Sequence, residues 1–248
     1  MKKLMTALAV CAAATISMAQ SVPSANVVGY STVPVKATDY TMLGINFQAV
    51  GGNDVAINSY FQGNFAGGPD QPDADTLITW SLASGYKAYF YCQGVDPSLD
   101  NNWLDLSYNI ATNTLPVGSA CWLLRRGPAT NLVFSGQVKT TVTATTIKAN
   151  DYTMFSNPYP TLLPINGGIN VVSPTGGPDQ PDADTLIGWS LASGYKAYFY
   201  CQGVDPSLDN NWLDLGYSIT TDTINIGGAA WYLRRGSQTT MSFTSPLQ

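Results

Sequence analysis

The chain contains the same unit of sequence twice, and this duplication limits its fold more than any other feature. Residues 67–108 and 176–217 align at an offset of 109 positions. The two segments differ only at Thr79/Gly188 and Ser107/Gly216. Weaker matches on both sides, such as DYTM and a Trp-X-Leu-Arg-Arg-Gly motif, extend the unit to about 110 residues. We therefore expect two equivalent repeats.

Composition predicts that each repeat is built from strands. Only 11% of the residues are charged, glutamate is absent, and Thr, Ser, Gly, Tyr and Val are abundant, which disfavours helices and favours sheets. We predict an all-β protein of two tandem antiparallel repeats, each sandwich-like or barrel-like, over residues 20–138 and 139–248. Two separate domains and two halves arranged with pseudo-twofold symmetry both fit the pattern.

Alternating apolar and polar residues, bounded by turn residues, locate the strands. The clearest hairpin is LITWSLASGYKAYFYC, in which Thr76–Leu82 and Tyr86–Cys92 flank a turn with Gly85 where a positive φ is needed. A short helix is predicted at 54–61, whereas prolines interrupt the corresponding segment of the second repeat. The predicted strands of the first repeat, each with a partner in the second, are 27–35, 40–47, 76–82, 85–92, 119–126 and 131–138.

The N-terminal residues predict export. Two lysines precede an apolar run from Leu4 to about Ile16, and Ser17-Met18-Ala19 places small residues where a signal peptidase reads the chain. We expect a signal peptide over residues 1–19 and a mature chain that is extracellular, on the cell surface or periplasmic. The apolar run is too short to span a bilayer, and we expect no transmembrane segment in the mature chain.

Charge and composition exclude several partners and reactions. All 16 acidic residues are aspartates, and the formal net charge of −5 argues against binding to nucleic acid, whose phosphates require a basic surface. Histidine is absent, which removes Ser-His-Asp and Cys-His catalysis and the commonest zinc ligand. Paired aspartates can hydrolyse glycosides, but a unit this small leaves little material for the shaped cleft they need. We therefore expect no enzyme, with a small aspartate-based hydrolase as the weaker alternative.

Aspartate-rich loops make calcium the candidate metal, and no other cofactor is expected. Calcium takes about six to eight hard oxygen ligands, and the loops GGPDQPDADTLI and DPSLDNNWLD carry several carboxylates in each repeat. The spacing does not match an EF-hand, and Asp beside Pro and Gly is also typical of turns, which we favour. The candidate calcium ligands are Asp70, Asp73, Asp75, Asp96, Asp100, Asp179, Asp182, Asp184, Asp205 and Asp209.

The strand GYKAYFYC raises a second binding hypothesis. Alternate residues of a strand share one face, so tyrosines and a lysine form a row that suits a polysaccharide or a partner protein. The alternative to a binding surface is a half-buried sheet face that serves packing alone, since tyrosine is common on such faces. The tryptophans are predicted to be core or core-edge anchors. The candidate ligand-binding residues are Lys87, Tyr89 and Tyr91, with Lys196, Tyr198 and Tyr200 in the second repeat.

Two arginine pairs end a predicted strand in each repeat. Adjacent residues of a strand face opposite ways, so the two members of Arg125-Arg126 and of Arg234-Arg235 have different roles. We expect one arginine of each pair to bind a loop aspartate and so fix the geometry of that loop. Binding of an anionic ligand is the weaker alternative.

The mature chain has an odd set of cysteines, Cys92, Cys121 and Cys201, in an oxidising compartment. We favour a disulfide between Cys92 and Cys121, which leaves Cys201 free to link chains. A bridge between Cys92 and Cys201 across a pseudo-dyad is the rival.

Several segments together resemble a known group of proteins. SANVVGY after the signal peptide, followed by DADTLITW, GYKAYFY and WLLRRG, is similar to exported bacterial β-repeat proteins with an NVVGY segment at that place. The resemblance covers most of the mature chain and implies export and a β-rich fold. It carries over no activity and no site residue.

These features favour a non-enzymatic secreted or cell-envelope structural or assembly protein. Because a duplicated unit presents one surface twice, it suits self-association or binding to another envelope protein. A carbohydrate-binding or adhesive module is the alternative.

Overall fold

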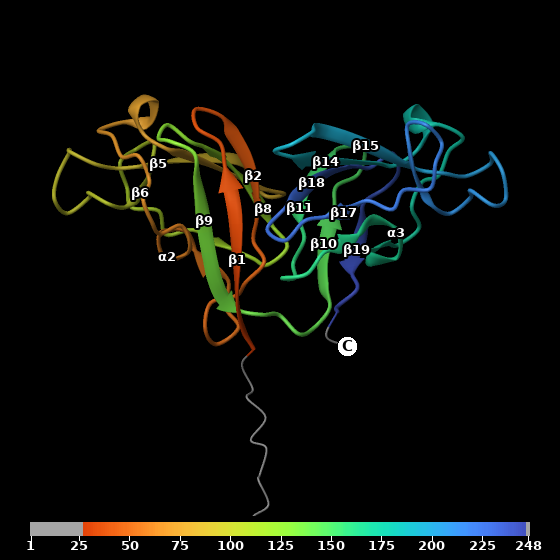
Figure 1. Ribbon diagram of the computed structural model, residues 1–248, viewed down its shortest axis with the longest axis horizontal. Helices are drawn as coiled ribbons and strands as arrows, with labels where there is room; N and C mark the ends of the chain where they lie inside the picture. Colours follow the sequence, from red (N-terminus) through yellow and green to blue (C-terminus); the bar gives the residue numbers. More distant parts are fainter. Residues whose placement is uncertain (1–26, 247–248) are drawn as a thin grey trace, which may run out of the picture.

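Strands dominate the molecule, which confirms the all-β class. The computed structural model describes residues 27–246, and the predicted signal peptide lies outside them. The two halves lie side by side, the first coloured red to green and the second green to blue (Figure 1). Within residues 27–246, no helix is long and apolar enough to cross a bilayer.

Each half is built on a five-stranded antiparallel sheet. The strands of the two sheets are β2 Tyr40–Gly44, β4 Thr76–Ser81, β5 Gly85–Tyr91, β6 Trp103–Asp105 and β8 Ala120–Leu124, and β11 Tyr152–Ser156, β14 Thr185–Ser190, β15 Gly194–Tyr200, β16 Trp212–Asp214 and β18 Ala229–Leu233. Their order is β2-β8-β4-β5-β6 in the first half and β11-β18-β14-β15-β16 in the second. Strands that correspond in sequence therefore occupy corresponding places in the two sheets.

Further strands pack against one face of each large sheet. They are β1 Val28–Val35, β3 Val55–Ala56, β7 Thr114–Leu115 and β9 Thr130–Gln137, and β10 Thr143–Ile147, β12 Leu163–Pro164, β13 Ile169–Val171, β17 Thr223–Ile224 and β19 Thr239–Phe243. They form the antiparallel arrangements β1-β9 and β3-β7 in the first half and β10-β19-β13 and β12-β17 in the second. The core of the first half lies between these layers, because Leu43 and Leu77 of the large sheet pack with Val33 and Phe134 of β1 and β9.

The predicted hairpin forms as expected. Thr76 pairs with Phe90 and Ser81 with Gly85 in the antiparallel register of β4 and β5. Gly85 has φ +66° and the equivalent Gly194 has φ +69°, a conformation in which glycine lacks the steric cost of a side chain.

The predicted helix at 54–61 is shorter than expected and has a counterpart in the second half. It is reduced to α2, Ile57–Tyr60, because β3 takes up the residues before it. The second half contains the equivalent turn α3, Ile165–Gly168, despite its prolines. Both turns present an asparagine, Asn58 or Asn166, whose side-chain oxygen accepts a hydrogen bond from the backbone N–H of the tryptophan that begins β6 or β16. A shared requirement to satisfy this N–H accounts for the repeated turn.

The predicted disulfides do not form. Cys92, Cys121 and Cys201 are all free and buried. Cys92 lies with Phe90 in a small cluster on one face of the first large sheet. Cys121 lies with Tyr89 in the core on the other face. Because the sheet separates the two thiols, no bridge between them is possible, and Cys201 lies in the equivalent small cluster of the second half.

A buried ion pair anchors the loop that precedes β4. Asp75 and Arg125 form this pair, with side chains 0% and 4% exposed. The Asp75 carboxylate also accepts hydrogen bonds from the backbone N–H groups of Ala66, at 2.8 Å, and Arg126, at 2.5 Å. Arg126 turns its side chain outward. The prediction that one arginine of each pair binds a loop aspartate is therefore confirmed.

The second half repeats this arrangement and adds a partner. Asp184 pairs with buried Arg234 and accepts hydrogen bonds from the backbone N–H groups of Thr175, at 2.9 Å, and Arg235, at 2.7 Å. Tyr232 donates a further hydrogen bond to the same carboxylate, at 2.6 Å. Each buried charge is thus compensated by both an opposite charge and several donors, as a buried carboxylate requires.

Reciprocal backbone hydrogen bonds join the two halves. The N–H of Gly44 donates to the carbonyl of Gly227, and the N–H of Ser156 donates to the carbonyl of Gly118, each at 2.8 Å. Gly44 and Ser156 end the equivalent strands β2 and β11, and Gly118 and Gly227 are equivalent in the repeat. Contacts that exchange equivalent residues are the pattern of a twofold axis, here an approximate one.

Replacement of Arg125 tests the anchoring pair. Arg125→Met leaves the Asp75 carboxylate buried without its cation, so we expect the free energy of unfolding to fall by about 3–5 kcal/mol. Arg126→Met is the matched control, because only the backbone of Arg126 serves the loop, and we expect a change within about 0.5 kcal/mol. Urea denaturation of the purified variants measures both, and equal losses would contradict the structural role given to Arg125.

Replacement of Gly44 tests the junction between the halves. A Cβ atom at Gly44 lies 2.6 Å from the carbonyl oxygen of Gly228 and 2.6 Å from the Cβ of Ser156. Gly44→Ser, which introduces the residue of the other half, is expected to cost about 1–3 kcal/mol by overpacking. Ser156→Gly introduces no such clash and should cost less than about 1 kcal/mol. Thermal unfolding of the two variants checks this order, and a reversed order would show that the two strand ends do not meet as described.

Candidate functional site

Four tryptophans pack together where the two halves meet. Trp80 lies edge-to-face against Trp231 at 6.4 Å between ring centroids, and Trp122 lies against Trp189 at 5.9 Å. Each pair joins one half to the other, and the four rings are half-buried around a small buried cluster of methionine and alanine side chains. The remaining tryptophans, Trp103 and Trp212, are buried in the two main cores. The prediction that the tryptophans are core or core-edge anchors is confirmed.

Exposed tyrosines surround this tryptophan cluster. Tyr86 contacts Trp231 of the other half, and Tyr195 contacts Trp122, at centroid distances of 6.4 and 6.5 Å. Tyr40 and Tyr152 contact the tryptophans of their own halves at 6.4 and 6.3 Å. Tyr86 and Tyr195 are 57% and 62% exposed. The rings are therefore held by aromatic contacts while much of their surface remains open to solvent.

These rings enclose an open hollow of about 610 Å³ between the halves. We call it the aromatic hollow, and it is lined by Tyr40, Ile78, Tyr86, Trp122, Tyr195 and Trp231. Burial and the nearby carboxylate of Asp151 raise the pKa of Tyr86, so its phenol stays protonated at neutral pH and can donate a hydrogen bond. The hollow therefore combines apolar ring surfaces with phenolic hydroxyl groups at its rim.

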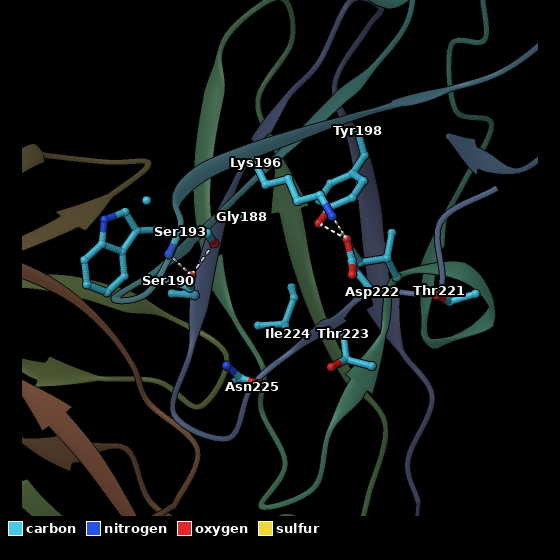
Figure 2. Close-up of a pocket in the computed structure, with 14 residues that line it drawn as sticks. Gly188, Ser190, Ser193, Lys196, Tyr198, Thr221, Asp222, Thr223, Ile224 and Asn225 are labelled. Carbon is cyan, nitrogen blue, oxygen red and sulfur yellow. Dashed lines mark hydrogen bonds and ion pairs between the residues drawn. The ribbon is translucent and has the colours of Figure 1, made fainter. Parts of the chain in front are cut away.

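A second, polar cavity of about 360 Å³ lies in the second half beside the hairpin of β14 and β15 (Figure 2). We call it the polar pocket. Lys196 and Tyr198 converge on Asp222 at one side, and Ser190 and Ser193 lie at another (Figure 2). The Tyr198 hydroxyl donates to Asp222 Oδ2 at 2.6 Å, and Lys196 forms an ion pair with the same oxygen.

The charge states in the polar pocket follow from these contacts. The hydrogen bonds from Lys196 and Tyr198 lower the pKa of Asp222. Burial, followed by the Asp222 carboxylate, raises the pKa of Tyr198. At neutral pH the pocket thus holds a carboxylate, a protonated phenol and an ammonium group whose charge balances the carboxylate.

The open tyrosine face predicted from the sequence is not formed. Tyr89 and Tyr198 are only 2% and 4% exposed and lie in the main cores. Tyr91 and Tyr200 are half-buried and pack against the same cores. The alternative prediction, a half-buried sheet face, is correct, because the strands that pack on each large sheet cover this side of it. The exposed ends of the two rows are Lys87 and Lys196.

The candidate calcium ligands do not gather into one cluster among the described residues. Asp75 and Asp184 are engaged by arginines, and Asp96 accepts hydrogen bonds from both the backbone N–H and the hydroxyl of Ser98. Asp100 caps the backbone N–H of Gly94 at 2.8 Å. Among the described residues, no group of three or more acidic or cysteine side chains is arranged to hold a metal. The candidates that form no such group are Asp70, Asp73, Asp75, Asp96 and Asp100, and Asp179, Asp182, Asp184, Asp205 and Asp209. Asp75 and Asp184 serve ion pairs, and Asp96, Asp100, Asp205 and Asp209 serve turns. Asp70 Oδ1 and Asp179 Oδ1 are buried without a hydrogen-bond partner.

Several residues of both cavities escaped the sequence analysis. Asp222 lies outside the near-identical block, and its only signal is that it aligns with Asn113 in the first repeat. Tyr86 and Tyr195 lie on the strand face opposite to the one selected. In the sequence they alternate with Ala88 and Phe90, or with the equivalent residues of the second half. This alternation does not reveal that the other half of the chain borders this face.

Comparison of the chain with protein-family models, with curated proteins and with solved structures gives no match.

Proposed function

We propose that this protein is an exported, non-enzymatic carbohydrate-binding protein, and that the aromatic hollow between its halves holds a polysaccharide chain. The single observation that carries this proposal is the ring of exposed tyrosines around half-buried tryptophans. An open apolar surface of this kind on a soluble protein marks a binding site.

The chemistry of the hollow favours sugar over other ligands. A pyranose ring presents apolar C–H faces and polar hydroxyl edges, and it needs both to be matched. The rings of Trp122 and Trp231 supply apolar surface, while Tyr86 and Tyr195, each more than half exposed, line the same hollow and carry hydroxyl groups. Tyrosine has this dual character, with an apolar body and a hydrogen-bonding tip.

The arrangement also favours a chain over a single sugar. The hollow is built from equivalent aromatic residues of both halves, so it offers two similar sets of contacts along one surface. A polymer of repeating units can use both sets at once, which raises its affinity without any new type of contact.

Removal of the two rim tyrosines tests this proposal. We expect Tyr86→Ala with Tyr195→Ala to weaken binding of the preferred polysaccharide at least tenfold, which corresponds to about 1.4 kcal/mol. Binding is measured by pull-down with insoluble cellulose, chitin and bacterial peptidoglycan and by affinity electrophoresis in gels containing soluble glucans, mannans and galactans.

Tyr30→Ala is the matched control for this experiment. Tyr30 is an exposed tyrosine of β1, 77% exposed and outside the hollow, so its loss should leave polysaccharide binding unchanged. An equal loss in this control, or no retention by any of the polysaccharides, would overturn the proposal.

A second candidate function, assembly into a larger structure, is favoured by a different surface. The β1-β9 ribbon carries Val28, Tyr30 and Val133 on its outer side, 67%, 77% and 62% exposed. Tyr30 faces Ser135 and Thr32 faces Val133 in the register of the two strands, so these side chains lie near one another. We propose that copies of the chain, or another envelope protein, associate through this ribbon, since an exposed apolar strand pair invites pairing with another chain.

The assembly function predicts a size change. Tyr30→Lys places a charge on the ribbon and should shift the mature protein from oligomer to monomer in light scattering after size exclusion. Tyr86→Ala with Tyr195→Ala should leave the oligomer intact. A wild-type protein that is monomeric at the highest soluble concentration would refute this function and leave the carbohydrate proposal standing.

A further inference from the structure

The two halves differ at the floor of the polar pocket. Gly188 lies in β14, and a Cβ atom there would meet only ordinary contacts, the carbonyl oxygen of Lys196 at 3.8 Å and a ring carbon of Tyr198 at 3.9 Å. The equivalent residue of the first half is Thr79. Its side chain is buried, and its hydroxyl donates to the carbonyl of Lys87 at 3.4 Å. Glycine therefore leaves open, in the second half, a volume that threonine fills in the first.

A second difference lies at the wall of the same pocket. In the first half the hydroxyl of Tyr89 donates to Asn113 Oδ1 at 2.8 Å. In the second half Asp222 replaces that amide, and its Oδ2 accepts from both Tyr198 and Lys196. The carboxylate thus draws the lysine into the pocket wall. Asp222 Oδ1 takes part in neither of these two bonds, and the Thr220 side chain interacts with the same carboxylate.

The remaining lining is polar but carries no further charge. Figure 2 shows hydroxyl and amide side chains around the pocket. They are Ser190, Ser193, Thr221, Thr223 and Asn225. Because Lys196 neutralises Asp222, an ionic ligand would lose its hydration without a net opposite charge to meet it. Ile165 and Ile224 add apolar surface to the lining. A neutral ligand with many hydroxyl groups on an apolar ring satisfies this lining best.

We propose that the polar pocket is a separate binding site for one neutral sugar ring, present in the second half and closed in the first by Thr79. Its volume of about 360 Å³ lies within the range of small-molecule sites. The site takes from the proposed function only the carbohydrate class of its ligand. It differs from the aromatic hollow in residues, polarity and ligand size. Its lining differs from the first half at Gly188 and Asp222, and also at Ile224 and Asn225, where the first half has Leu115 and Pro116.

The experiment transfers residues between the halves. The probes are D-glucose, D-galactose, D-mannose and N-acetyl-D-glucosamine, measured by saturation-transfer NMR and by calorimetric titration. The wild-type chain is expected to bind at least one of them saturably at one site per molecule. Gly188→Thr introduces the residue of the first half and should weaken that binding at least tenfold. Since the threonine is accepted at the equivalent place in the first sheet, the variant should fold, and an unchanged melting curve verifies this.

The controls distinguish this site from the hollow and from general damage. Gly216→Ser makes the other substitution of the near-identical block, in an exposed loop, and should leave sugar binding unchanged. The variant Thr79→Gly, Asn113→Asp, Leu115→Ile and Pro116→Asn gives the first half the lining residues that differ, and should create a second site, so the stoichiometry rises toward two. Tyr86→Ala with Tyr195→Ala should abolish retention of the polysaccharide while the monosaccharide remains bound. Absence of saturable binding of all four sugars, or equal binding by the Gly188→Thr variant, would overturn the inference, whatever the outcome at the aromatic hollow.

Discussion

Each half of the protein depends on one buried ion pair, Asp75 with Arg125 or Asp184 with Arg234. Two charges withdrawn from water are stabilising only when their remaining hydrogen-bonding capacity is met, and here backbone N–H groups from two separate segments converge on each carboxylate. The backbone of Asp75 also accepts from the N–H of Tyr91 in β5. One residue thus joins the loop before β4, the middle of the sheet and the end of β8, and these are the elements that hold the hairpin.

The same constraint gives a physical reason for the content of the GGPDQPDADTLI loop. A Cβ atom at Gly67 would lie 2.5 Å from the Cβ of Gln93, and one at Gly68 would lie 2.8 Å from the Cβ of Asp73. The equivalent distances in the second half are 2.5 and 2.9 Å. A loop drawn this tightly against the sheet admits no side chain at either glycine. Of its three aspartates, Asp75 is held by Arg125, so the loop takes its shape from this ion pair and from close packing at the two glycines.

Much of the fold was predictable because it depends on local patterns. Strand positions followed from alternation, and the hairpin turn from the need for glycine at Gly85. What alternation does not determine is which face of a strand is covered, since both faces of β5 carry aromatic residues. Tyr89 was placed on an open face because the covering strands, β3 and β7, are only two residues long and leave almost no periodic signal. The cysteine pairing failed for the same reason, because assigning the two thiols to opposite faces requires the sheet order.

The candidate sites were less predictable than the fold because both depend on how the two halves differ or meet. The aromatic hollow exists only when Tyr86 of one repeat reaches Trp231 of the other, a contact between segments 145 positions apart in sequence. Close to the approximate twofold axis, the two copies of a position cannot both carry a side chain, because the side chains would overlap. Gly44 of one half therefore leaves room for the Cβ of Ser156. Away from the axis this steric requirement does not operate, and the two copies differ there at residues that line the polar pocket. Gly188 and Asp222 lie far apart in sequence, yet they border one cavity together with Lys196 and Tyr198. Thr79 and Asn113 of the first half would pack equally well. What Gly188 and Asp222 add is an open space in which the charge of the carboxylate is balanced by Lys196.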